Sequence, residues 1–112
     1  MVKIEAVIHP FKLDEARTAL EALDILEITT SEVSDHGSVE RLLYRGAEYR
    51  AAAPRIKLEL LVSGAHADQV ISAVMRAART PVNGDHDGRI LVYEVTDAIN
   101  IHSGAHLQYS LP

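Results

Sequence analysis

The sequence predicts an α+β domain whose elements run strand, helix, strand, strand, helix, strand. Three observations predict this order: segments with alternating apolar residues, segments where apolar residues recur every three or four positions, and turn-forming residues between them. The order is the split βαβ arrangement of a ferredoxin-like fold, with both helices on one face of the sheet. A long loop, residues 35–54, separates the second and third strands.

The first strand and the first helix have the simplest patterns. Residues 2–8 alternate, with Ile4 and Ile8 on one face, as in a half-buried strand. Pro10 stops the strand and favours the start of a helix. Residues 12–23 then carry apolar side chains at helical spacing, which predicts one buried helix face.

The second half of the fold follows the same two periods. Residues 26–33 are rich in β-branched side chains and predict the second strand. Residues 56–62 alternate and predict a central strand, and residues 65–79 predict the second helix. A loop of turn-forming residues, 81–88, precedes the last strand at 89–95.

The predicted sheet has one face without helices. Val7, Leu61 and Leu91 lie on that face, and we expect neighbouring subunits to cover them. His9 and His66 stand beside the two helix starts and are expected at the surface.

Residues 42–54 match neither helical nor strand periodicity. They combine two tyrosines and two arginines with a central glycine. An irregular excursion in a small domain is usually functional, because its backbone stays unpaired until a ligand or partner orders it. We therefore expect the function of the protein to involve this stretch.

Composition limits the class of protein. The chain has 112 residues, enough for one domain with its own core, and it is 47% hydrophobic and 24% charged. A net charge of −5 without a basic run argues against nucleic-acid binding. The absence of cysteine excludes disulfides and thiolate metal sites. No apolar run reaches the ~20 residues that span a bilayer, and we expect a cytoplasmic protein without direct membrane insertion.

Motifs for catalysis are absent from the sequence. It contains no G-x-S-x-G, no H-E-x-x-H and no Walker A motif. Glu59, in the middle of a strand, could act as a general base, but such a residue more often faces solvent or a subunit partner. We therefore do not expect an enzyme.

Three stretches resemble the PII signal-transduction family, the nitrogen-regulatory proteins. Residues 44–49, Tyr-Arg-Gly-Ala-Glu-Tyr, resemble its T-loop, and residues 3–15 resemble its opening strand and first helix. Residues 77–90 resemble its second helix and its nucleotide-binding B-loop. The resemblance implies a homotrimer that binds an adenine nucleotide between subunits and regulates a target protein, such as a membrane transporter or a metabolic enzyme.

The resemblance also divides the chain and implies site residues. It makes residues 1–112 one domain, with a T-loop at 35–54, a B-loop at 81–88 and a C-terminal segment at 96–112. The implied nucleotide contacts are Val7, Thr29, Gly37, Ser38, Glu59, Leu61, Gly84, Asp85, Gly88, Arg89, Asn100 and His102. The implied target contacts are Tyr44, Arg45, Glu48, Tyr49 and Arg50. Glycine-rich turns can hold phosphate on successive backbone N–H groups, to which Arg89 would add charge.

Two segments depart from the family pattern. Residues 35–39 read Asp-His-Gly-Ser-Val where the family typically has Gly-Phe-Gly-Arg-Gln, so we expect its 2-oxoglutarate sensing to be lost. Residues 100–104 read Asn-Ile-His-Ser-Gly where the family usually has Arg-Ile-Arg-Thr-Gly. Two arginines that would contact phosphate are missing. Each charged hydrogen bond lost with them lowers the binding free energy for the phosphates by roughly 1.5–3 kcal/mol. We therefore expect AMP or ADP to be preferred over ATP.

Two alternatives remain open. The fold would bring several histidines and a carboxylate to one intersubunit cleft, where they could bind a divalent metal such as Zn²⁺, Ni²⁺ or Cu²⁺. These residues are His36, His86, Asp87, His102 and His106. They predict a metal-binding or metal-responsive trimer, although solvated loop side chains are the more common explanation. The other alternative is a structural trimer whose ligand site has decayed.

Overall fold

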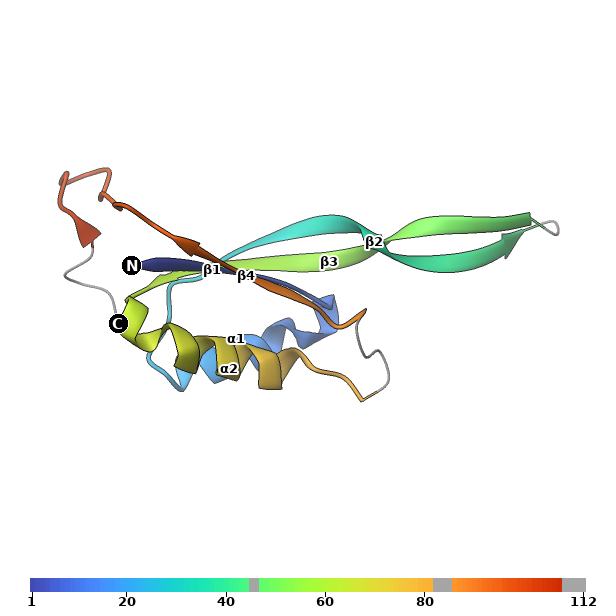
Figure 1. Ribbon diagram of the computed structural model, residues 1–112, viewed down its shortest axis with the longest axis horizontal. Helices are drawn as coiled ribbons and strands as arrows, with labels where there is room; N and C mark the ends of the chain where they lie inside the picture. The colour runs from blue at the N-terminus through green and yellow to red at the C-terminus, as the bar shows by residue number, and fades with distance from the viewer. Residues whose placement is uncertain (45–46, 82–85, 108–112) are drawn as a thin grey trace.

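The computed structural model describes residues 1–44, 47–81 and 86–107, and for residues 37–44 and 47–52 it describes the backbone alone. The elements are β1 (Val2–Ile8), η1 (Pro10–Lys12), α1 (Leu13–Glu21), β2 (Thr29–Tyr44), β3 (Ala47–Val62), η2 (Gly64–His66), α2 (Ala67–Ala78) and β4 (Gly88–Glu94). Both helices lie on one face of the sheet, and β2 and β3 extend beyond it as a long arm (Figure 1). The predicted fold class is confirmed.

The four strands form one antiparallel sheet in the order β2-β3-β1-β4. β1 is central, and its Ile4 lies opposite Leu60 of β3 and Val92 of β4. Each helix connects two strands that have a third strand between them, which is the ferredoxin-like topology.

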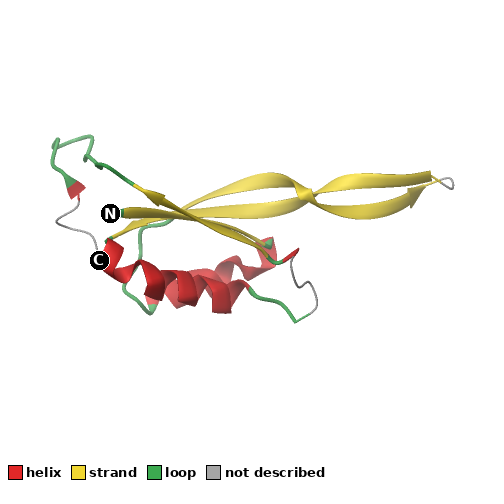
Figure 2. Ribbon diagram, viewed as in Figure 1, coloured by secondary structure: helices red, strands yellow, loops and turns green. Residues whose placement is uncertain are grey.

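The core lies between the sheet and the two helices (Figure 2). It forms because strand residues two apart and helix residues three or four apart each line one face. The largest fully buried side chains are Ile4, Ile8, Leu20, Leu58, Val62, Val70 and Val74. Each contributes about 1.5–3 kcal/mol through burial, so the core fixes which face of the sheet stays open.

Helix α1 ends in a Schellman turn, which delays the second strand. Asp24 adopts a left-handed conformation with φ 61°. The amide of Ile25 donates to the carbonyl of Leu20 over 3.0 Å, and the amide of Asp24 donates to Glu21 over 2.9 Å. The strand expected from residue 26 therefore begins at Thr29.

The stretch expected to be irregular is largely a two-stranded ribbon. We call residues 35–54 the arm. Beyond a register irregularity between Asp35 and Glu40, the two strands pair from Glu40 opposite Ala51 to Tyr44 opposite Ala47. They leave the sheet as antiparallel neighbours, so continued pairing satisfies their backbone N–H and C=O groups. This backbone pairing does not require alternating side chains, which is why periodicity missed it.

Candidate functional site

The sheet face opposite the helices carries the candidate site at the base of the arm. We call it the open face. Its residues alternate with those of the core along each strand, so the register identifies them. They are Lys3, Glu5, Val7, Lys57, Glu59, Leu61, Arg89, Leu91 and Tyr93.

The centre of the open face is a network of charged side chains. Nζ of Lys57 lies 3.3 Å from a carboxylate oxygen of Glu59 and 3.7 Å from one of Glu5. Nζ of Lys3 lies 3.8 Å from Glu59 and 4.9 Å from the ring centre of Tyr93. The hydroxyl of Tyr93 donates a 3.2 Å hydrogen bond to Glu5. The open face therefore carries an ion-pair network beside the apolar residues Val7, Leu61 and Leu91.

These contacts explain two altered acidities. The hydrogen bond and the charge of Glu59 raise the pKa of Lys57, and Glu5 adds to this effect. The hydrogen bond to Glu5 raises the pKa of Tyr93. Glu59 was the residue that the sequence suggested as a possible general base. Its carboxylate is shared between Lys3 and Lys57, and this geometry suits an ion-pair network.

An ion pair joins the start of β4 to the base of the arm. Nη1 of Arg89 lies 3.2 Å from Oδ2 of Asp35, although β4 and β2 are opposite edges of the sheet. Val7, opposite Arg89 in register, is 3% exposed within the single chain. The expectation that a neighbouring subunit buries Val7 is therefore wrong, whereas Leu91 is 40% exposed.

The connection from α2 to β4 closes on Asp87. Its carboxylate accepts hydrogen bonds from the amide of Thr80, at 2.9 Å, and from the Thr80 hydroxyl, at 2.6 Å. These bonds, with a smaller effect of His9, hold the pKa of Asp87 below its ordinary value. Gly88 follows with φ 127°, and a Cβ there would collide with the carbonyl oxygen of Val7. The chain can therefore enter β4 this close to β1 only with glycine.

His9 does not lie at the surface as expected. Its side chain is 9% exposed, and Nε2 lies 3.5 Å from Oδ1 of Asp87. The ring stacks on Phe11 with 5.1 Å between centroids. Pro10 turns the chain directly after His9, which places the imidazole between Phe11 and the α2–β4 connection. His66 is exposed, as predicted, and its Nδ1 lies 2.9 Å from Oγ of Ser63.

Arg55 is a buried cation that the sequence analysis did not single out. It is 8% exposed, and its Nη1 donates a 2.8 Å hydrogen bond to the carbonyl of Pro54. Its Nε has no hydrogen-bond partner among the described residues. Arg55 borders a hollow of about 460 Å³ that Pro10 and Glu32 also line. The available signal was a cation directly after a proline, at the start of the apolar run 56–62. A buried cation is costly unless it is paired, so its place beside an apolar run marks it as unusual.

The C-terminal segment folds back as a hook, residues 96–107. Oδ1 of Asn100 accepts hydrogen bonds from the amides of His102 and Ser103 at 2.9 and 3.0 Å. Nδ1 of His106 lies 2.8 Å from Oδ1 of Asp97, and this hydrogen bond lowers the pKa of Asp97. Asn100, expected to contact a nucleotide, thus uses its side-chain oxygen to shape the turn.

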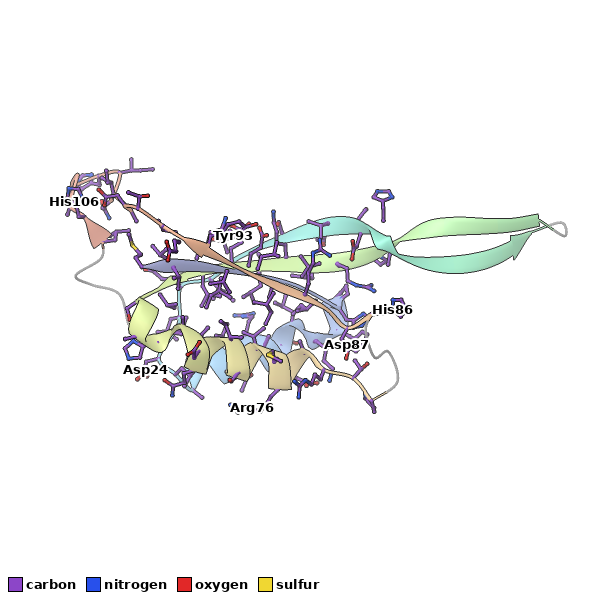
Figure 3. All side chains as sticks on the ribbon, viewed as in Figure 1. Asp24, Arg76, His86, Asp87, Tyr93 and His106 are labelled. Atoms are coloured by element: carbon purple, nitrogen blue, oxygen red, sulfur yellow. The ribbon has the colours of Figure 1, made fainter. Side chains whose placement is uncertain are left out.

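The metal candidates do not converge within one chain. His86 and Asp87 lie at one end of β4, and His106 lies beyond the other end (Figure 3). Among the described residues, no three His, Asp or Glu side chains are placed to hold a metal ion. Asp87 is also engaged by Thr80. A metal site built from His36, His86, Asp87, His102 and His106 would therefore need more than one chain.

The predicted nucleotide contacts do not all lie together in one chain. Val7, Glu59, Leu61 and Arg89 share the open face, and Thr29 lies opposite Glu59 in register. Asn100 and His102 belong to the hook, at the end of β4 away from Arg89. Gly37 and Ser38 are described by backbone alone, within the irregular part of β2, and Gly84 and Asp85 lie outside the described residues.

The predicted target contacts that the structure describes lie at the outer part of the arm. Tyr44 pairs with Ala47, Tyr49 with Leu42, Glu48 with Leu43 and Arg50 with Arg41. Arg45 lies outside the described residues. No helix within the described ranges is long and apolar enough to cross a membrane.

Fold and site together define a small α+β protein with a ferredoxin-like sheet, a protruding ribbon and an arginine at its base. The family model for nitrogen regulatory protein P-II matches residues 1–105. The P-II proteins of Pasteurella multocida and Haemophilus influenzae are 43% and 44% identical to the chain over 107 residues. Protein P-II 1 of Escherichia coli K12 is 39% identical over 107 residues. Each comparison covers 93% of this chain and 94% of the relative. The chain belongs to the nitrogen regulatory protein P-II family.

Proposed function

We propose that the protein is a homotrimeric regulator that binds an adenine nucleotide between subunits and acts on a target protein through its arm. The observation that carries the proposal is the Arg89–Asp35 ion pair, which joins a cation suited to phosphate to the base of the arm. A ligand that engages Arg89 therefore acts at the point where the arm leaves the sheet. Membership of the P-II family supports the same function.

The placement of the site residues supports a cleft between subunits. Arg89 lies at the start of β4, while Asn100 and His102 follow its other end, so one chain does not bring them together. A second copy, with its hook against the first copy's open face, would complete the site. The ligand would then hold two subunits in place as well as the arm.

Charge favours a nucleotide with few phosphates. Asp35 contacts the cation, Asp87 precedes it by two residues, and the hook offers an amide and an imidazole instead of guanidinium groups. Electrostatic repulsion from the carboxylates increases with the charge of the ligand. AMP or ADP is therefore the proposed effector, in preference to ATP.

Exposed apolar residues support the assembly. Leu91 and Tyr93 of the open face are 40% and 43% exposed, and Ile99 and Ile101 of the hook are 56% and 102% exposed. Such residues on neighbouring elements are typical of an interface. The regulated target, by the same family argument, is a membrane transporter or a metabolic enzyme.

Titration calorimetry with AMP, ADP and ATP tests the proposal. The protein should bind AMP or ADP more tightly than ATP. Arg89→Ala should weaken ADP binding about tenfold or more, because a charge-assisted hydrogen bond contributes roughly 1.5–3 kcal/mol. Arg76→Ala is the matched control, since Arg76 is an exposed arginine on α2 (Figure 3). If no adenine nucleotide binds, or if both variants lose affinity equally, the proposed site is wrong.

A further inference from the structure

We propose that Asp35 competes with the phosphate groups of the ligand for Arg89, so that ligand binding releases the base of the arm. The inference rests on the proposed function, since it concerns the same site. It gives Asp35 two roles: it sets how much negative charge the site accepts, and it couples occupancy of the site to the arm.

The first observation is the position of Asp35. It is the last residue of β2 in regular register with β3, opposite Ala53, before the irregularity that leads into the arm. Its side chain is 11% exposed, against 53% for Arg89. The carboxylate is therefore held at the junction between sheet and arm, while the cation that it contacts remains accessible from solvent.

The second observation is the fixed placement of Arg89. The two residues before Arg89 are held in position. Asp87 accepts two hydrogen bonds from Thr80, and Gly88 packs against the carbonyl of Val7. The guanidinium fork can bind two oxygen atoms of a carboxylate or of a phosphate, and the same geometry suits both. A phosphate that binds through Nη1 of Arg89 replaces the carboxylate of Asp35.

The third observation is that the pair spans the sheet. Arg89 on β4 and Asp35 on β2 belong to opposite edge strands of the sheet. Breaking the pair removes a cross-sheet contact at the base of the arm. The displaced carboxylate also stays near the bound phosphates, where its repulsion is larger for ATP than for AMP.

Calorimetry with Asp35→Asn tests the competition, because the amide keeps the shape and loses the charge. Affinity for ADP should rise about three- to tenfold, the range expected when a partly exposed ion pair no longer competes. The gain should be larger for ATP, smaller for AMP and absent for adenosine. Glu27→Gln is the control for net charge, since Glu27 is exposed and lies in the loop before β2. It should change none of these affinities.

Hydrogen exchange tests the coupling to the arm. Amides at residues 33–36 should exchange faster in Asp35→Asn than in the parent protein without ligand. Saturating ADP should raise exchange there in the parent to about the level of the variant. If ligand leaves exchange at these amides unchanged or slows it, the release of the arm is wrong.

The outcomes separate this inference from the proposed function. If nucleotides bind but Asp35→Asn gains no affinity, the nucleotide site stands and Asp35 is a structural brace, which overturns the inference. If no nucleotide binds either protein, the proposed function is wrong. The competition between Asp35 and phosphate is then tested by measuring the binding of inorganic pyrophosphate to both proteins. Tighter pyrophosphate binding by Asp35→Asn than by the parent supports competition for Arg89. Equal binding, or none, overturns it.

Discussion

The hydroxyl of Thr80 donates a 2.6 Å hydrogen bond to Oδ1 of Asp87. The amide of Thr80 donates a second bond, of 2.9 Å, to Oδ2 of the same carboxylate. These bonds tie the residue that follows α2 closely to the residue before β4, so Asp87 helps to fix where β4 begins.

We expect Asp87→Asn to lower the free energy of unfolding at pH 7 by about 1–2 kcal/mol, because the amide has one acceptor oxygen and can keep only one of the two hydrogen bonds from Thr80. The folded-state pKa of Asp87 is lowered, so its contribution is present above the unfolded pKa near 3.9 and is lost as pH falls through the lower folded value. Urea unfolding at pH 7 and pH 3 should therefore show the difference between parent and variant shrinking with acid. A constant difference would contradict this assignment.

Gly88→Ala should destabilise the protein by about 3 kcal/mol, the sum of a strained backbone and an overpacked contact. The collision is with the backbone of Val7, which cannot rotate away. Gly64→Ala is the matched control, because a Cβ there meets nothing within 4 Å. Thermal unfolding should distinguish the two, and equal melting temperatures would show that β4 can shift away from β1.

Arg55→Met should raise the free energy of unfolding by about 1–2 kcal/mol, because it replaces a buried cation with an unpaired Nε by an apolar side chain. Arg79→Met, at an exposed position after α2, should change it by less than about 0.5 kcal/mol. Denaturant titration measures both. A clear loss of stability in Arg55→Met would mean that assembly supplies a partner for this guanidinium.

Light scattering should give three times the chain mass of 12.3 kDa. Leu91→Lys should weaken this assembly, because it replaces an exposed apolar side chain of the proposed interface with a charged one. The lysine would stand opposite Glu5, a favourable cross-strand pair, so the fold of the chain should persist. Leu26→Lys, at a position 76% exposed, should leave the mass unchanged. A parent protein that is monomeric at micromolar concentration would exclude the trimer.

Elements with a strong period were predictable from the sequence. The limits of β1 agree with the prediction, and both helices lie where apolar spacing placed them, because the core selects residues that share a face. The paired strands of the arm were not predictable, because backbone pairing between neighbouring strands does not require alternating apolar and polar side chains in the sequence.

Single contacts between distant segments were also beyond the sequence. Nε2 of the buried His9 lies 3.5 Å from Asp87, and the partner of Arg89 is Asp35, 54 residues away in the chain. Local patterns do not specify such pairs. The resemblance indicated Arg89 as a site residue, but only the folded chain identifies its partner.

The arm gives the protein mechanical leverage. The molecule is 59 Å long but only 28 and 20 Å across, and the arm supplies much of the excess length (Figure 1). At about 3.3 Å per residue, the strand from Asp35 to Tyr44 reaches about 30 Å. A tilt of about 10° at its base would displace its outer end by about 5 Å, more than the length of a hydrogen bond. A change too small to disturb the core could thus make or break a whole set of contacts on a bound protein.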